Sequence, residues 1–241
     1  NICILSTMVL VMVSTTVCMY LGVEDSLKAR FSKDCVLRMD NVTQKDMDAA
    51  LKTINYSAGD KIENLNYYTS LGLSAKRDGN SFNVIDRDIS YIDSSVAMVD
   101  FITSDEYSRI AGKIVNLADD EVLVFEAYGK LDNTLNIFNK TYKIKDHIKE
   151  LAVDGYNASL MLQQYYIVLN QKEMDYINSA QKNALGQKAS GISAVVMFDL
   201  NTQNNEKPLI ANKISKNLSE KITTNYYIEN RQASSMDFYA L

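Results

Sequence analysis

The sequence predicts a mixed α+β domain that contains a small β-rich lobe and is preceded by one transmembrane helix. Three observations lead to this prediction. Residues 2–21 form a run of uncharged, mostly apolar residues. After residue 33, segments that begin with helix-capping residues alternate with short apolar runs typical of buried strands. Residues 119–149 contain only short strand-like segments separated by turns.

The apolar run has the length of about 20 residues that a helix needs to cross the hydrocarbon core of a membrane. Its Ser and Thr side chains can bond to carbonyls of their own helix or face neighbouring helices. A secretory signal peptide would have an apolar core of about 7–15 residues and a small-residue cleavage site. The run is longer and has no clean site of that kind. We therefore expect a transmembrane helix over residues 1–23 that continues through Val23–Lys33 as a helical stalk.

The composition limits the class of protein, the partners and the disulfides that the rest of the chain can have. The 46% hydrophobic and 23% charged residues are typical of a globular domain. The net charge is −5, and no basic cluster is present, which argues against nucleic acid as a partner because phosphate binding needs concentrated Lys and Arg. Beyond the apolar run the only cysteine is Cys35, so no disulfide can form within the domain.

Four helix starts can be located from capping signals. A Ser, Thr, Asn or Asp followed three residues later by an acid satisfies the first backbone N–H groups of a helix, and Pro is tolerated in the first turn. The signals are Thr43 with Asp46, Thr103 with Glu106, Asn170 with Glu173, and Pro208. The glycines at 59 and 112 are expected to end the first two helices.

Apolar runs between these helices predict a shared sheet, with strands at 35–39, 66–77, 81–86, 96–102, 191–200 and 226–228. The dipeptide Asp78-Gly79 predicts a two-residue hairpin turn that would set Ala75 opposite Phe82, whereas a loop that includes Asn80 would shift this register. We assign residues 24–118 and 171–241 to a main α/β lobe. Residues 119–170 are expected to form an inserted β-rich lobe with strands at 121–127, 134–138 and 142–148 and a turn at Asn139-Lys140. The strand at 165–169 pairs with this lobe or with the main sheet.

Residues for catalysis or metal binding are scarce. His147 is the only histidine and lies far from Cys35 in the sequence, so a structural or solvent-facing role is favoured over a Cys–His pair. No phosphate-binding glycine motif and no zinc ligand set occurs. The acidic groups 86–88 and 119–121 lack the pattern of a calcium loop and are interpreted as solvated turns. The sequence therefore predicts no catalytic residue, cofactor or metal.

Consecutive tyrosines suggest a surface for a ligand. Neighbouring residues in a strand face opposite sides, so each Tyr-Tyr pair is expected to place one ring inward and one outward. Outward tyrosines are enriched at binding surfaces, although the preference of Tyr for strands explains the pairs equally well. The candidate ligand surface consists of Tyr67, Tyr68, Tyr165 and Tyr166.

Three stretches together resemble one protein family. They are ICILSTMVLVMVSTTVCMYLGVEDSL at 2–27, VAMVDFITSDEYSRIAG at 96–112 and DDEVLVFEAYGKLDNTLNIFNKTYKIKDHIKE at 119–150. These stretches are similar to FtsX-like ABC transporter permeases, in particular the bacitracin-export, BceB-type permeases of antimicrobial-peptide resistance. They cover about a third of the chain, and the first is the most specific.

The resemblance implies an extracellular domain of a multi-pass protein of the cell membrane, with residues after about 23 outside. It also implies a separate ABC ATP-binding subunit that hydrolyses ATP, a membrane histidine kinase as a further partner, and a peptide antibiotic or lipid-linked target as ligand. The family has no catalytic residues here to carry over. The alternative is the extracytoplasmic sensor domain of a receptor kinase. A surface hydrolase would need a reactive histidine or cysteine.

Overall fold

The computed structural model of the 241-residue chain describes residues 33–86, 96–126, 130–149 and 163–231. The expected transmembrane helix and nearly all of the stalk lie outside these residues. Within the described ranges, no helix has both the length and the apolar character needed to span a membrane. The prediction of a mixed α/β domain is confirmed, since helices pack against a sheet of ten strands.

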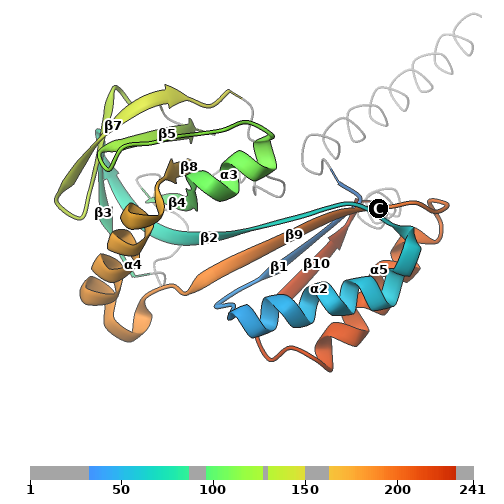
Figure 1. Cartoon of the computed structure of the whole chain (residues 1–241). Helices are drawn as coiled ribbons and strands as arrows, with labels where there is room; N and C mark the ends of the chain where they lie inside the picture. The colour runs from blue at the N-terminus through green and yellow to red at the C-terminus, as the bar shows by residue number, and fades with distance from the viewer. Residues whose placement is uncertain (1–32, 87–95, 127–129, 150–162, 232–241) are drawn as a thin grey trace, which may run out of the picture.

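One half of the molecule is a split β-α-β arrangement of the ferredoxin-like type. Its strands lie in the order β10-β1-β9-β2, and each pair of neighbours is antiparallel. Both connecting helices cover the same face of the sheet (Figure 1). In chain order the elements are β1 (Cys35–Met39), α2 (Gln44–Ala58), β2 (Ile62–Asp78), β9 (Ile192–Leu200), α5 (Lys207–Ser219) and β10 (Tyr226–Asn230).

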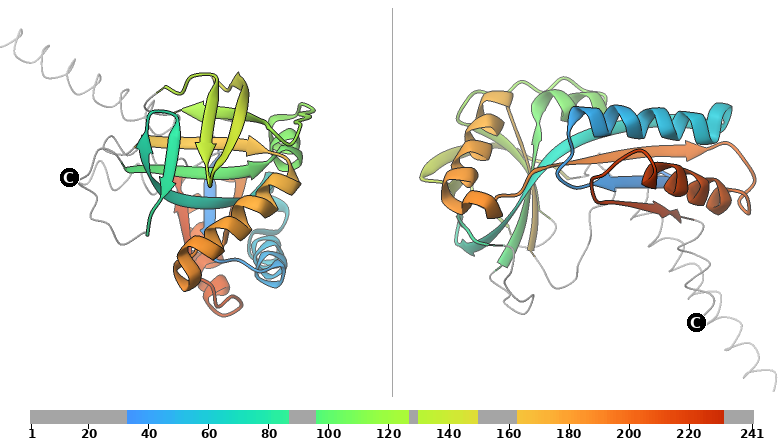
Figure 2. Two further views of the ribbon diagram at one scale, coloured as in Figure 1. Left: turned by 90° about the vertical axis from the view of Figure 1, so that its left-hand side faces the viewer. Right: turned by 90° about the horizontal axis from the view of Figure 1, so that it is seen from below.

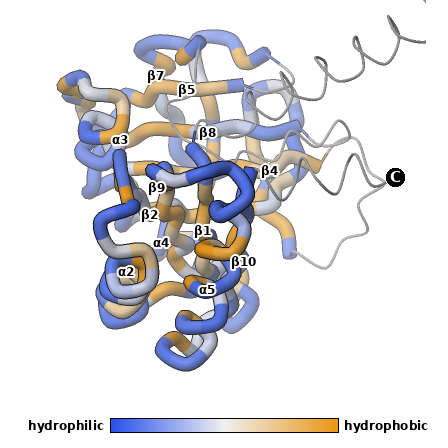
Figure 3. The backbone as a smooth tube through the Cα atoms, turned by 90° about the vertical axis from the view of Figure 1, so that its right-hand side faces the viewer, coloured by the Kyte–Doolittle hydropathy of each residue, from blue (hydrophilic) through white to orange (hydrophobic). Residues whose placement is uncertain are grey.

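Alternation along the strands produces the core of this half. Every second residue of β1 and β9 faces α2 and α5, and Leu37, Val196 and Phe198 are completely buried there. From the helices, Ile54 and Ile214 meet them, and both are also fully buried. Burying one such side chain contributes roughly 1.5–3 kcal/mol. Apolar positions run along the strands in Figure 3.

The connection between β2 and β9 carries the second half, a closed ring of strands. β2 pairs with β3 on one side and with β4 on the other. The ring then continues in the order β3-β6-β7-β5-β8-β4. Its further elements are β3 (Ser81–Val84), β4 (Val96–Thr103), α3 (Ser104–Ala111), β5 (Glu121–Glu126), β6 (Thr134–Ile137), β7 (Lys140–His147), β8 (Gln163–Leu169) and α4 (Gln171–Leu185). Short 3₁₀ turns at Gly59–Lys61 and Gly186–Lys188 follow α2 and α4.

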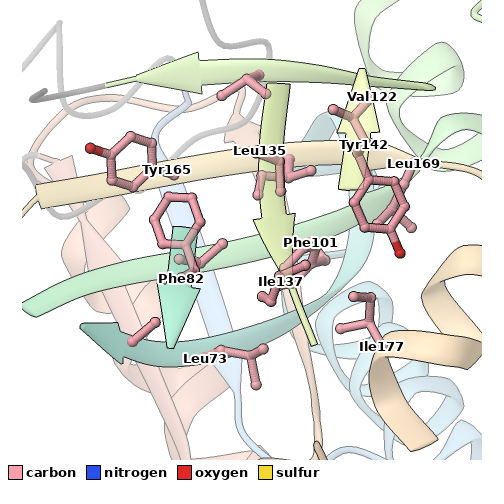
Figure 4. Close-up of a cluster of buried hydrophobic side chains, with 14 of the residues drawn as sticks. Leu73, Phe82, Phe101, Val122, Leu135, Ile137, Tyr142, Tyr165, Leu169 and Ile177 are labelled. Carbon is pink, nitrogen blue, oxygen red and sulfur yellow. The ribbon is translucent and has the colours of Figure 1, made fainter. Parts of the chain in front are cut away.

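Side chains fill the interior of the ring, so it is a core and not a channel. Phe82 and Tyr165 meet edge to face with ring centroids 5.0 Å apart (Figure 4). Leu135 and Phe101 lie in the same cluster, and Ile177 of α4 packs onto it. A third cluster lies around α3, where Tyr107 is buried against β2, β4 and β8.

The two halves are arranged end to end. β1 begins and β10 finishes at one end of the molecule, because the two strands are antiparallel and Cys35 lies opposite Asn230. β2 runs from this end to the other and passes into the wall of the ring (Figures 1 and 2). The chain therefore enters and leaves the described domain side by side, and the ring lies at the opposite end.

The helix starts are confirmed. Thr43 and Asp46 form a reciprocal capping box at α2, Thr103 accepts from the backbone N–H of Glu106 at α3, and Asn170 accepts from that of Glu173 at α4. Pro208 lies in the first turn of α5. The end of α3 is also as expected, because Gly112 adopts a left-handed φ of 64°.

Two predicted turns are wrong by one residue. Asp78 pairs with Ser81, so the hairpin turn consists of Gly79 and Asn80, and Ala75 lies opposite Val84 instead of Phe82. Gly79 takes the positive φ, 57°, at the first central position. The turn expected at Asn139-Lys140 consists instead of Phe138 and Asn139, with φ of 49° and 60°. Two consecutive positive φ values characterise a type I′ turn, which matches the twist of the flanking strands.

The strand at 165–169 pairs with both of its candidate partners, because β8 lies between β5 and β4. In the ring, the strands β5, β6, β7 and β8 are joined to β2, β3 and β4. The sequence assigned the last three strands to the main lobe. The division into a main lobe at 24–118 and 171–241 and an insert at 119–170 stays a prediction.

Candidate functional site: a charged junction where the chain enters and leaves

A cluster of charged side chains lies where the chain enters and leaves the described domain. We call Lys33, Asp34, Asp199, Lys207 and Arg231 the junction. Lys33 and Asp34 precede β1, and Arg231 follows β10. Asp199 is the penultimate residue of β9, and Lys207 begins α5. The fold thus brings together residues from both ends of the domain and from the strand that returns from the ring.

Asp34 is the most buried member, with a side chain only 7% exposed. One carboxylate oxygen, Oδ2, accepts from Lys207 Nζ at 2.7 Å and from the backbone N–H of Leu200 at 3.0 Å. The other, Oδ1, accepts from Arg231 Nη2 at 2.9 Å. The backbone oxygen of Asp34 accepts from the N–H of Arg231, also at 2.9 Å. A buried carboxylate is tolerated only with such partners, since its desolvation is costly.

Asp199 connects the entering chain to β2. Its carboxylate accepts from Lys33 Nζ at 3.1 Å, from the backbone N–H of Asp34 at 3.2 Å and from Asn64 Nδ2 at 2.8 Å. Burial by itself would raise the pKa of Asp199, but the hydrogen bonds from Asn64 and Lys33 outweigh it and hold the pKa below its usual value. Asn64 lies in an irregularity of β2, where the register shifts between Glu63 and Asn66.

The junction is a network of ion pairs and hydrogen bonds. Two carboxylates pair with three cations, and these ion pairs lie within the domain. No group of three or more His, Cys, Asp or Glu side chains suitable for a metal ion occurs among the described residues. The junction ties the entering segment, the leaving segment, β9 and β2 to one another.

Sequence reasoning missed the junction. Asp34 and Arg231 are separated by 197 positions, and no local pattern links them. A weak signal was present in β9, where Asp199 interrupts the apolar run from Ala194 to Leu200. A carboxylate next to buried residues requires a partner, but the sequence does not name it.

The four candidate tyrosines do not share one surface. Tyr67 is 37% exposed and Tyr68 is buried, as expected for neighbours in a strand. Tyr165 and Tyr166 are both buried, so the expectation of one outward ring is wrong for this pair. β8 is covered on both faces, by the interior of the ring and by the cluster around α3. The ligand-binding role of these residues stays a prediction.

Tyr67 lies at an edge of β2 that α3 covers. The Arg109 guanidinium stacks 4.7 Å from the centroid of the Tyr67 ring and donates to the Tyr67 carbonyl. Glu106 accepts from the backbone N–H of Thr69 at 2.8 Å. The side chains of α3 thus take the place of a neighbouring strand and protect an edge that would otherwise invite pairing with another chain.

Cys35 and His147 belong to different parts of the fold. Cys35 is buried between β1 and the helices α2 and α5, and burial raises the pKa of its thiol to about 12. A thiol in this state is a poor nucleophile at neutral pH. His147 lies on β7 in the ring, with Nδ1 3.4 Å from Glu126 Oε1.

The acidic group at 119–121 is engaged by lysines. Asp119 pairs with Lys172, Asp120 with Lys143 and Glu121 with Lys145, and these hydrogen bonds lower the pKa values of all three acids. Asp119 and Asp120 lie in an exposed turn before β5, which agrees with the interpretation as a solvated turn, and Glu121 begins the strand. In the group at 86–88 only Asp86 is described, and it pairs with Lys188.

Comparisons with known proteins identify a structural similarity only. No family model matches the sequence, and no curated protein matches it. Among solved structures, the chain resembles the periplasmic region of MacB from Actinobacillus actinomycetemcomitans, with 9% identity and a TM-score of 0.39. The match covers 91% of this chain and 99% of the other. At this level of similarity nothing about the function of this chain follows from the match.

Proposed function

We propose that this chain is the extracellular domain of an FtsX-like ABC transporter permease, together with the transmembrane helix that precedes it. The observation that carries the proposal is the placement of the two ends of the described domain, at Lys33 and Arg231. Both lie at one end of the domain, tied by Asp34, while the ring lies at the other end. A domain inserted between membrane helices requires this geometry, because both ends must return to the same surface.

Two features of the sequence support the proposal. The uncharged run at 2–21 ends shortly before Lys33, the first described residue and a member of the junction. The three stretches that resemble FtsX-like permeases extend over residues 2–27, 96–112 and 119–150, so the similarity includes both the apolar run and strands of the ring.

In this proposal the protein is a multi-pass protein of the cell membrane, with residues after about 23 outside the cell. ATP is hydrolysed by a separate ABC ATP-binding subunit. The outer domain engages antimicrobial peptides or their lipid-linked targets, and the junction couples it to the movement of the membrane helices. A membrane histidine kinase is a further proposed partner.

Deletion of residues 23–239 from the full-length protein tests the proposal in cells. We expect loss of resistance to peptide antibiotics, while the ATP-binding subunit still copurifies with the membrane part. The variant Asp34→Asn should lower resistance in the same direction. The matched control is Lys61→Gln, which removes the exposed ion pair to Glu206 beside the junction. Unchanged resistance after the deletion contradicts the proposal.

A sensor domain of a receptor kinase also needs adjacent ends, so the same geometry favours this alternative. The coding sequence beyond Leu241 separates the two. Several further membrane spans identify a permease, and a single span followed by a cytoplasmic kinase module identifies a sensor.

A further inference from the structure

A groove lies between α4 and the turn that joins β6 to β7. It is lined mainly by apolar and small side chains, with one exposed aromatic ring, Tyr176. The remaining lining residues are Phe138, Asn139, Ser179, Ala180, Asn183 and Ala184. The groove is held open on one side by the type I′ turn, whose Phe138 carbonyl accepts from the Tyr176 hydroxyl at 2.9 Å.

One end of this groove adjoins a site that holds a cation. Lys140 Nζ lies 5.2 Å from the centroid of the Tyr142 ring and 5.3 Å from that of the Tyr176 ring. Both distances fall within the range of about 6 Å for cation–π attraction. The same ammonium group pairs with the carboxylate of Glu173. We call Tyr142, Tyr176 and Glu173 the cation seat, which the chain's own Lys140 occupies.

The seat contains a buried carboxylate group. The side chain of Glu173 is only 2% exposed, and its Oε2 accepts from the Tyr142 hydroxyl at 2.8 Å. Burial and the hydrogen bond to Glu173 both raise the pKa of Tyr142, so its hydroxyl stays protonated and continues to donate. The carboxylate also lies in the first turn of α4, where the helix dipole favours a negative charge.

The ammonium group of Lys140 can be displaced from the seat. The Lys140 side chain is 32% exposed, and a lysine ammonium on its flexible stem is readily hydrated. An external ammonium group could therefore replace it without leaving Glu173 unpaired. Because one cation exchanges for another at the seat, net binding must come from apolar contact with the adjoining groove.

We propose that the cation seat and the groove together form a binding site for a peptide segment that carries an ammonium side chain next to an apolar residue. The ammonium group displaces Lys140 from Glu173, and the apolar neighbour lies along Tyr176, Ala180 and Ala184. Lys140 is thus an internal competitor. The inference rests on the proposed function and deepens it by naming a site and a ligand class. None of the four candidate tyrosines belongs to this site.

The test uses the whole 241-residue chain in detergent and the peptide acetyl-Lys-Phe-Leu-amide as the probe. Its matched control peptide carries norleucine in place of lysine. Titration calorimetry should show binding of the lysine peptide at least tenfold tighter than binding of the norleucine peptide. Equal affinities overturn the inference, because they leave no role for the seat.

Variants separate competition from a structural role. Lys140→Met empties the seat and should tighten binding of the lysine peptide about tenfold, whereas a purely structural Lys140 predicts weaker or unchanged binding. Ala184→Trp, at an exposed position, fills the groove and should weaken binding at least tenfold even if Lys140→Met does not fold. Lys172→Met, on the same helix, removes an exposed ion pair and should leave affinity unchanged. Unaltered affinity in Ala184→Trp contradicts the proposed site.

Loss of resistance on deletion of the domain, without peptide binding at the seat, would leave the permease proposal standing and reject this site alone.

Discussion

Removal of the Asp34 carboxylate is the sharpest test of the junction. In Asp34→Ala, Lys207 and Arg231 lose their shared partner, and the backbone N–H of Leu200 loses its acceptor. Removal of one partner from a buried ion pair costs about 3–5 kcal/mol. Lys207 is 13% exposed and Arg231 35%, so part of this cost is recovered by water. We therefore expect a loss of roughly 2–4 kcal/mol in the free energy of unfolding.

Urea unfolding of the whole chain in detergent, followed by far-ultraviolet circular dichroism, measures this loss. Asp34→Asn separates charge from shape, because its amide oxygen can still accept from Leu200 while the attraction to Lys207 and Arg231 is lost. We expect it to fall between wild type and Asp34→Ala. The control Glu206→Gln removes an exposed ion pair close to the junction and should leave the midpoint unchanged. A loss below about 1 kcal/mol in Asp34→Ala would show that the junction does not hold the chain ends together.

Three further predictions address other contacts. Gly191→Ala should destabilise the domain by about 1–3 kcal/mol, since the new Cβ would lie 2.2 Å from Asn41 Oδ1 and 3.0 Å from the Asn41 Cα, and thermal unfolding checks this. Because the folded state holds the pKa of Asp199 low, Asp199 contributes stability above the unfolded value of about 3.9 that is lost as pH falls below it, so the stability of Asp199→Asn should change less between pH 6 and pH 3 than that of wild type. On intact cells, a membrane-impermeant maleimide should label Tyr56→Cys, at a position 83% exposed, and leave the buried Cys35 unlabelled, as peptide mass mapping can show; an unlabelled Tyr56→Cys would contradict an extracellular domain.

The sequence predicted the helix starts well because their signals are local. A capping side chain accepts from the backbone N–H three positions further on, as Thr43 does from Asp46, so both partners lie within a few residues of sequence. The hairpin register was wrong for a similarly local reason. Asp78-Gly79 and Gly79-Asn80 are both plausible turns, and only the pairing of Asp78 with Ser81 decides between them. The register differs by two positions along one strand, so Ala75 and Phe82 still face the same core.

Long-range placement could not be predicted in the same way. The sequence predicted one inward and one outward ring at Tyr165 and Tyr166, because neighbouring residues of a strand face opposite sides. This alternation does not reveal a second layer that covers the other face, and both rings are buried. The junction depends on contacts such as that between Asp34 and Leu200, which are 166 positions apart. The cation seat combines a strand residue and a helix residue, Tyr142 and Glu173, whose proximity follows from the packing of α4 onto the ring.

β2 extends from one end of the described domain to the other. Its first part pairs with β9 from Ile62 to Leu71, and its last part forms the wall of the ring between β3 and β4. The sheet and the ring therefore share one strand of 17 residues. Asp199 links the entering Lys33 to Asn64 near the start of that strand. Asn64 lies in the irregularity between Glu63 and Asn66, and from Asn66 onward β2 reaches the ring without a loop.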